Sequence, residues 1–230
     1  MSNKLAGKKQ PEKKQINMGT VGIIIVVVVV IMLALIFALT RKSDSNNNNS
    51  GQNTASDTQD NVDVSQVSGP IVTIAVKDYG DIVVQLDENA APLTVENFVS
   101  LIKDGFYDGL TFHRIIDGFM IQGGDPLGNG TGGSENTIKG EFSSNGVDNP
   151  ISHKRGVISM ARSQDMNSAS SQFFIVQSDS TFLDGEYAGF GYVTSGMEIV
   201  DQICKDTPVQ DDNGKVDAQD RPVIESITVS

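Results

Sequence analysis

The sequence predicts a mainly β fold: a closed eight-stranded antiparallel β-barrel with two capping α-helices, preceded by one transmembrane helix and a disordered linker. Three observations support this prediction. An uncharged apolar run occupies residues 21–39, a polar stretch without aromatic residues follows it, and the remaining chain alternates short β-rich segments with glycine-rich turns. Short strands separated by turns, with only two helical patterns among them, favour an antiparallel barrel over an alternating βαβ sheet.

The apolar run predicts a transmembrane signal-anchor helix at residues 19–40. As a helix, the run would span about 28 Å, close to the hydrocarbon thickness of a bilayer. A cleaved signal peptide is the alternative, but its apolar region is usually about 7–15 residues long and ends at small residues. Five lysines precede the run, and only Arg41 and Lys42 follow it closely. The positive-inside rule therefore makes residues 1–18 a basic cytoplasmic tail and places the rest of the chain outside the cell membrane.

The linker is predicted at residues 41–68. This stretch is rich in Asn, Ser, Asp and Gln, and its only large apolar residues are three valines. Such a composition cannot bury enough apolar surface to offset the entropy lost on ordering. We therefore expect a flexible tether between the membrane helix and a domain at residues 69–230.

The first elements of this domain follow from simple periodicities. Residues 71–76 and 82–86 are β-rich and flank a turn at 78–81, which indicates a hairpin. Pro92 suits the first turn of a helix, where its missing N–H costs little. One face of that helix then carries Val95, Phe98, Val99 and Ile102.

The later elements are short and separated by glycines. A second helix is predicted at residues 196–205, where Ile199, Val200 and Ile203 lie on one side. Closing the sheet into a barrel would leave no exposed edge for aggregation. The further strands are predicted at residues 110–116, 119–122, 157–161, 172–177, 189–193 and 223–229.

Charge and composition exclude several classes of function. Residues 1–42 hold seven basic residues and one acidic residue, whereas residues 43–230 hold ten basic and 28 acidic residues. A body this acidic is repelled by phosphate backbones, so no nucleic acid partner is expected. Cys204 is the only cysteine and there are two histidines, which predicts no internal disulfide, no metal site and no cofactor.

Three weaker patterns are interpreted as structural. Residues 128–133 match the dinucleotide pattern G-x-G-x-x-G, but neither a strand before nor a helix after them is predicted, so a surface loop is expected. Residues 211–214 lack the spaced ligands of a calcium loop and are read as an acidic hairpin tip. His113 and His153 are expected to be structural histidines with their hydrogen bonds satisfied.

Residues 112–125 carry the strongest chemical signal. They read FHRIIDGFMIQGGD, and a turn at Asp117-Gly118 would place Arg114 and Gln122 side by side on paired strands. An arginine on an otherwise apolar surface is costly to bury without a partner. Its presence therefore indicates a function rather than ordinary core packing.

These segments resemble the cyclophilin family of peptidyl-prolyl cis–trans isomerases. The pattern FHRII-x-GFM-x-QGGD is followed, in the family's order, by SQFFI at 171–175 and FLDG-x-Y-x-x-FG at 182–191. The resemblance covers residues 69–230 and is strongest to the short bacterial type. It implies a cyclophilin-like barrel, a rotamase activity on proline-containing polypeptides, and no cofactor.

The resemblance also implies roles for particular residues. Arg114, Gln122 and Phe119 correspond to the catalytic set. Phe182 stands where many members have Trp, a residue that matters for tight cyclosporin binding in the family, so weak cyclosporin binding is expected. Tyr187 stands where many members have His, and activity without that His is expected because the reaction needs no proton transfer. The substrate-binding residues implied are Met120, Ala161, Arg162, Gln172, Phe174, Phe182, Leu183 and Tyr187.

The predicted function is rotation about Xaa-Pro bonds, assisting the folding of exported or surface proteins outside the membrane. The reaction needs no covalent step, only an apolar slot for the ring and a donor that favours the twisted amide. The alternative is a non-catalytic proline-peptide binding module or chaperone tethered to the membrane. The complete set of Arg114, Gln122 and Phe174 favours the enzyme.

Overall fold

The computed structural model describes residues 66–230. The basic tail, the transmembrane helix at 19–40 and nearly all of the linker at 41–68 lie outside the described residues, so these remain predictions. Within the described part of the chain, no helix has both the length and the apolar character needed to cross a bilayer.

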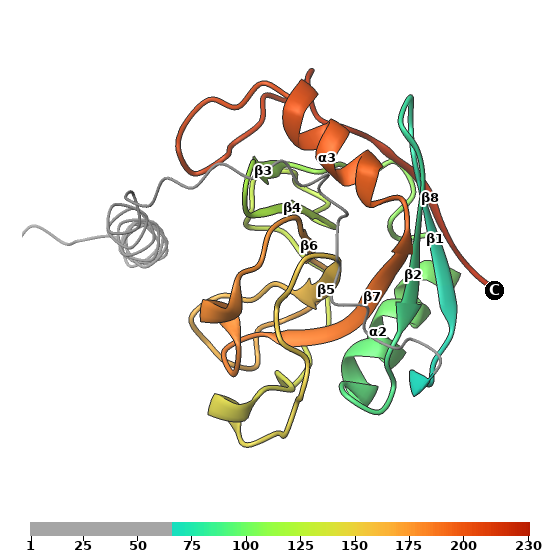
Figure 1. Ribbon diagram of the computed structural model, residues 1–230, viewed down its shortest axis with the longest axis vertical. Helices are drawn as coiled ribbons and strands as arrows, with labels where there is room; N and C mark the ends of the chain where they lie inside the picture. Colours follow the sequence, from blue (N-terminus) through green and yellow to red (C-terminus); the bar gives the residue numbers. More distant parts are fainter. Residues whose placement is uncertain (1–65) are drawn as a thin grey trace, which may run out of the picture. The chain divides into compact units, whose positions relative to one another are not determined.

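Eight antiparallel strands form one strongly curved sheet (Figure 1). The order of the strands across the sheet is β3-β4-β6-β5-β7-β2-β1-β8. The hairpin predicted at residues 71–86 is confirmed, as are short strands at or within about two residues of most predicted positions. The strands are β1 Ile71–Val76, β2 Gly80–Leu86, β3 Arg114–Ile116, β4 Met120–Gly123, β5 Val157–Met160, β6 Phe173–Val176, β7 Ala188–Ser195 and β8 Ile224–Val229.

Two α-helices pack against the sheet, as predicted. Helix α2 spans Pro92–Lys103 and begins at its proline, and helix α3 spans Met197–Asp206. Helix α2 contacts β7 and β8, and α3 contacts β2. Short 3₁₀ turns lie at Ser143–Asn145 and Thr181–Leu183.

The prediction of a closed barrel is wrong, because the sheet is open between β3 and β8. Strand β3 has only three residues, and the first four residues of the predicted strand at 110–116 are irregular apart from a bridge at Thr111. This segment makes isolated contacts with the start of β8, such as the Thr111–Val223 bridge and the bond from Ile224 N to the carbonyl oxygen of Leu110 at 2.8 Å. Individual bonds therefore span the gap without a continuous ladder.

The two faces of the sheet bury different sets of side chains. Strand alternation sends Ile115, Ile121 and Ile175 into the main core, where Phe98 and Phe173 pack edge to face. The opposite face of β4 and β6 carries a second, smaller apolar cluster. That cluster contains Ala90, Met120, Ile151, Val157, Phe174, Val176 and Leu183.

Candidate active site

Arg114 and Gln122 face each other across the β3–β4 hairpin. They are register partners, and Arg114 Nη1 donates a hydrogen bond to Gln122 Oε1 at 3.2 Å. Phe174 on β6 is the register partner of Gln122, so the three residues form one row across the sheet. Because paired residues share a face, this row lies on the side opposite the main core. The juxtaposition predicted for Arg114 and Gln122 is confirmed.

A relay of amide contacts continues from Gln122 toward the glycine-rich loop. Gln122 Nε2 donates to Gln172 Oε1 at 2.9 Å, and Gln172 Nε2 donates to the carbonyl oxygen of Gly132 at 2.7 Å. Since arginine can only donate, Gln122 must turn its oxygen toward Arg114, which sets the orientation of both amides. The relay therefore holds the two glutamines in defined positions.

One nitrogen of the Arg114 guanidinium, Nη2, has no partner among residues 66–230. The guanidinium Nε donates to the carbonyl oxygen of Asn213 at 2.8 Å, and its Nη1 donates to Gln122. The Nη2 atom is buried. A buried donor without a partner costs about 1–3 kcal/mol. The geometry thus keeps one strong donor available for a bound group.

The guanidinium of Arg114 stays positively charged although it is largely buried. Burial lowers the pKa of the Arg114 guanidinium, while Tyr187 and Asp211 act in the opposite direction. A guanidinium nevertheless keeps its proton at any working pH, so the site presents a permanent cation.

The second apolar cluster lies on the same face of the sheet as Arg114, and aromatic side chains pack against it. Met120, Phe174 and Leu183 are buried, whereas Phe119 and Tyr187 are half-buried and pack against them. The rings of Phe174 and Tyr187 meet edge to face at 5.9 Å. A permanent cation on the same sheet face as an apolar cluster suits a ligand with an apolar ring and a carbonyl oxygen.

The sequence model of the family described as cyclophilin type peptidyl-prolyl cis-trans isomerase/CLD matches residues 71–229. This match runs from the first residue of β1 to the last residue of β8. The chain belongs to the cyclophilin family. The enzyme class predicted from the sequence, a peptidyl-prolyl cis–trans isomerase, is confirmed.

Relatives from distant organisms support this assignment to the cyclophilins. A peptidyl-prolyl cis-trans isomerase of Helicobacter pylori is 48% identical over 126 residues, which cover 54% of this chain and 74% of the relative. Peptidyl-prolyl cis-trans isomerase B of Bacillus subtilis is 48% identical over 124 residues, covering 54% of this chain and 83% of the relative.

A solved structure shows the same fold. The crystal structure of a Cryptosporidium parvum cyclophilin type peptidyl-prolyl cis-trans isomerase, in the presence of the dipeptide Ala-Pro, has a TM-score of 0.61 and 33% identity. The match covers 70% of this chain and 98% of the Cryptosporidium chain.

The side chain of Arg162, one of the implied substrate-binding residues of this cyclophilin, contacts two aromatic rings. Its guanidinium carbon lies 4.9 Å from the ring centroids of both Phe142 and Tyr187. It also pairs with Glu186, with Nη2 3.3 Å from Oε2. A cation–π contact contributes about 0.5–1 kcal/mol at an exposed site, so Arg162 stabilises the observed position of Tyr187. The neighbouring Ala161 donates its N–H to the Gln172 carbonyl at 2.9 Å.

The two histidines of the cyclophilin domain differ from each other. His153 is satisfied as predicted, since its Nδ1 lies 2.9 Å from Asp184 Oδ1 and its Nε2 lies 2.9 Å from Ser159 Oγ. The prediction for His113 is wrong, because both of its ring nitrogens are buried without a hydrogen-bond partner in the described chain. His113 directly precedes β3, so its side chain points to the face opposite that of Arg114. It therefore does not lie beside the groups that accept hydrogen bonds from the guanidinium.

Sequence reasoning missed Asn213, whose carbonyl accepts from Arg114. A main-chain acceptor has no side-chain signature, so only the Asn-Gly turn at this place could have pointed to it. The predicted acidic hairpin tip at 211–214 is therefore part of the site's framework.

Proposed function

We propose that Arg114 is the catalytic residue of this cyclophilin and that it acts on Xaa-Pro bonds of polypeptides. The observation that carries the proposal is the buried Nη2 atom without a partner in residues 66–230. The Ala-Pro dipeptide present with the Cryptosporidium relative supports a proline-containing peptide as the ligand.

The physical problem is a slow rotation, not an unfavourable one. The cis and trans forms of an Xaa-Pro bond differ by only about 0.5–1 kcal/mol. The barrier between them is about 18–20 kcal/mol, because amide resonance is lost as the bond twists. A group that binds the twisted amide more tightly than the planar one lowers this barrier without covalent chemistry.

Arg114 can supply that group. Its Nη2 donates to the prolyl carbonyl oxygen and brings an N–H close to the imide nitrogen, whose lone pair localises as resonance is lost. Because Nε and Nη1 are already bonded to Asn213 and Gln122, the guanidinium reorganises little during the reaction. Donors that are already oriented are the most effective in stabilising a transition state.

The other predicted residues are proposed to hold the substrate around Arg114. The apolar side chains receive the pyrrolidine ring, the two glutamines contact the peptide backbone, and the end of β5 pairs with the bound peptide. The side chains that receive the ring are Phe119, Met120, Phe174 and Leu183. The glutamines are Gln122 and Gln172, and the residues at the end of β5 are Ala161 and Arg162. Phe182 and Tyr187 are proposed to border the ring site.

The test is Arg114→Ala in the full chain. We expect isomerase activity on an Xaa-Pro peptide, measured by NMR exchange, to fall about 10²–10³-fold, the effect of removing one oriented donor to developing charge. Circular dichroism and the melting temperature should show a folded domain. Equal activity in a folded Arg114→Ala protein would remove Arg114 from the mechanism.

We also propose that this domain works outside the cell membrane on exported or surface polypeptides. The support is the uncharged run at residues 21–39 and the five lysines before it. The linker at 41–68 would let the domain reach clients emerging near the bilayer.

Membrane topology can be measured directly. A chain with an N-terminal and a C-terminal epitope tag is expressed in cells with an accessible membrane, and protease is added outside. We expect loss of the C-terminal tag and protection of the N-terminal tag, with a cytoplasmic protein as the control for intact cells. Protection of both tags until lysis would place the domain inside.

A further inference from the structure

The geometry points to the turn Asp211–Lys215 as the element that positions Arg114. In this inference, which rests on the proposed function of Arg114, the turn presents the Asn213 carbonyl so that Nη2 remains the free donor. Asp211 and Gly214 shape the turn and are therefore positioning residues. They contact neither the substrate nor the reacting bond.

The turn is docked along the outer edge of β3. Arg114 Nε donates to Asn213 O at 2.8 Å, and Ile115 N donates to Gly214 O at 2.8 Å. Arg114 and Lys215 also form an isolated antiparallel bridge. The edge of β3 that a closed barrel would have paired with another strand is thus occupied by this turn.

Two contacts are needed to orient the guanidinium. Because the group is planar, a bond at Nη1 alone would let it pivot about that bond. The bond at Nε, from the opposite side of the fork, removes this freedom. Gln122 and the Asn213 carbonyl together therefore fix the plane and direct Nη2.

Asp211 holds the turn closed. Its Oδ1 accepts from the N–H groups of Asn213 at 3.0 Å and Lys215 at 3.2 Å. Its carbonyl accepts from Gly214 N at 2.9 Å. Aspartate and asparagine stabilise tight turns in this way, so the side chain of Asp211 orients the peptide that carries the Asn213 carbonyl.

Gly214 allows the close approach to β3. Its φ is +76°, and a Cβ at this position would lie 2.1 Å from the carbonyl oxygen of Ile115. Only glycine adopts this conformation without strain and leaves room for the neighbouring backbone. Any side chain here would push the turn away from Arg114.

The test compares Asp211→Ala, Asp211→Asn and Asp212→Ala in the full chain. Asp212 is exposed and adjacent, so Asp212→Ala removes the same charge without removing the turn's hydrogen bonds. We expect Asp211→Ala to lower kcat about 10-fold with KM changed less than about twofold, as expected for a misplaced catalytic group. Asp211→Asn keeps an oxygen acceptor and should restore most of the activity, and Asp212→Ala should match the wild type.

A spectroscopic readout separates positioning from general destabilisation. The Arg114 Nε–H signal in a ¹H–¹⁵N spectrum should be protected from exchange in the wild type and in Asp212→Ala. In Asp211→Ala it should exchange at least several-fold faster while core amide signals stay unchanged. Gly214→Ala should show the same changes, more strongly, if it folds. If Gly214→Ala does not fold, the kcat and the Nε–H exchange of Asp211→Ala alone test the inference.

Two outcomes would overturn the inference. One is a folded Asp211→Ala protein with wild-type kcat and an unchanged Nε–H signal. The other is an Asp212→Ala protein that loses as much kcat as Asp211→Ala, since charge rather than turn geometry would then act. Arg114→Ala, run in parallel, tells the two proposals apart: if it keeps activity the proposed function fails, and if it alone loses activity only the positioning role fails.

Discussion

Phe182 is the residue through which we expect the proposed ring site to limit cyclosporin binding. Its side chain is 44% exposed, and its ring lies 5.6 Å from that of Phe119. Trp at this position, as in many cyclophilins, would bury more apolar area against a ligand and add an N–H donor. We expect Phe182→Trp to bind cyclosporin about tenfold more tightly than the wild type, a difference of about 1.4 kcal/mol.

Isothermal titration calorimetry on both proteins measures this difference. Phe182→Leu serves as the control, because it keeps an apolar side chain but supplies neither the larger ring nor the donor. Unchanged affinity in a folded Phe182→Trp protein would show that another position limits cyclosporin binding.

Arg114 shows how far residue-level prediction reaches. Its contact with Gln122 was predictable, because the two residues flank one tight turn and strand pairing dictates the rest. Its contact with Asn213 joins residues 99 positions apart through a main-chain carbonyl. No local pattern encodes such a contact, since it depends on how the whole sheet brings the turn to β3.

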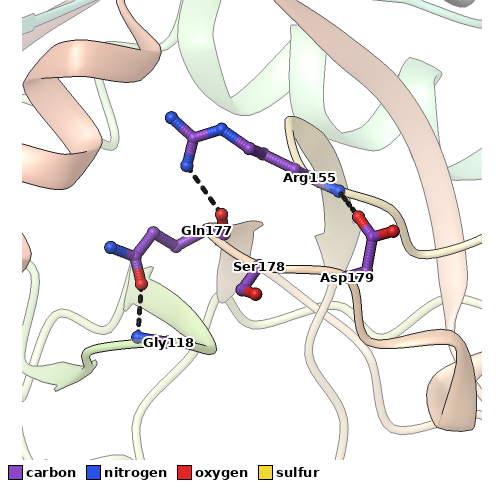
Figure 2. A pocket seen from close by; sticks show the side chains of 5 residues that line it. All are labelled: Gly118, Arg155, Gln177, Ser178 and Asp179. Atoms are coloured by element: carbon purple, nitrogen blue, oxygen red, sulfur yellow. Dashed lines mark hydrogen bonds between the residues drawn. The ribbon is translucent and has the colours of Figure 1, made fainter. Parts of the chain in front are cut away.

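At the level of elements, the side chain of Gln177 forms hydrogen bonds with both residues of the β3–β4 turn. Gln177 Oε1 accepts from Gly118 N at 2.5 Å, and its Nε2 donates to Asp117 Oδ1 at 3.0 Å. Gln177, Arg155 and Ser178 line a surface hollow of about 510 Å³. Figure 2 shows the Gln177 side chain extending to Gly118. These two hydrogen bonds, called the Gln177 clamp below, fix the turn directly before Phe119.

We therefore expect Gln177→Ala to weaken substrate binding. Losing hydrogen bonds worth about 1 kcal/mol should raise KM by roughly fivefold, because Phe119 becomes less well ordered, while kcat should change little. Steady-state kinetics on an Xaa-Pro peptide measures both constants. Ser178→Ala, which alters the same hollow, is the control and should behave as the wild type. An unchanged KM in Gln177→Ala would mean that the turn keeps Phe119 in place without the clamp.

The elements themselves were largely predictable, and the closure of the sheet was not. The hairpin at 71–86 and both helices follow from local periodicity, which needs no tertiary information. Closure depends on whether residues 110–113 pair as a strand with β8. Here they stay irregular and make isolated contacts, such as the bridge from Thr111 to Val223. Apolar content alone cannot distinguish a buried irregular segment from a strand.

Across the whole molecule, composition predicted the acidic domain, and the apolar run and lysines predicted the anchor. The domain at residues 69–230 contains the matched family segment 71–229. The anchor lies outside the described residues and remains a prediction, which the membrane-topology measurement tests.

Stability of the domain should depend on pH through its histidines. Burial lowers the pKa of His113 to about 4, with Arg221 and Arg114 acting in the same direction and Asp125 opposing them. Burial also lowers the pKa of His153. Between about pH 6.5 and 4 the unfolded chain binds protons that the folded domain does not, so the free energy of unfolding falls as the pH falls. For His113 the loss approaches about 3 kcal/mol at pH 4.

Urea unfolding at pH 7, 6, 5 and 4.5 measures this dependence, and His113→Gln is the matched variant. The glutamine does not titrate, so the variant should lose less stability between pH 7 and 4.5 than the wild type, whatever its stability at pH 7. Burial raises the pKa of Asp125 while its hydrogen bonds lower it, and the net change is downward. The pKa values of Asp184 and Asp201 are also lowered, so the stabilising contributions of these three carboxylates are lost mainly below the pH range of the measurement. Equal pH slopes in the two proteins would mean that His113 is protonated in the folded domain, with a partner such as Asp125 compensating its charge.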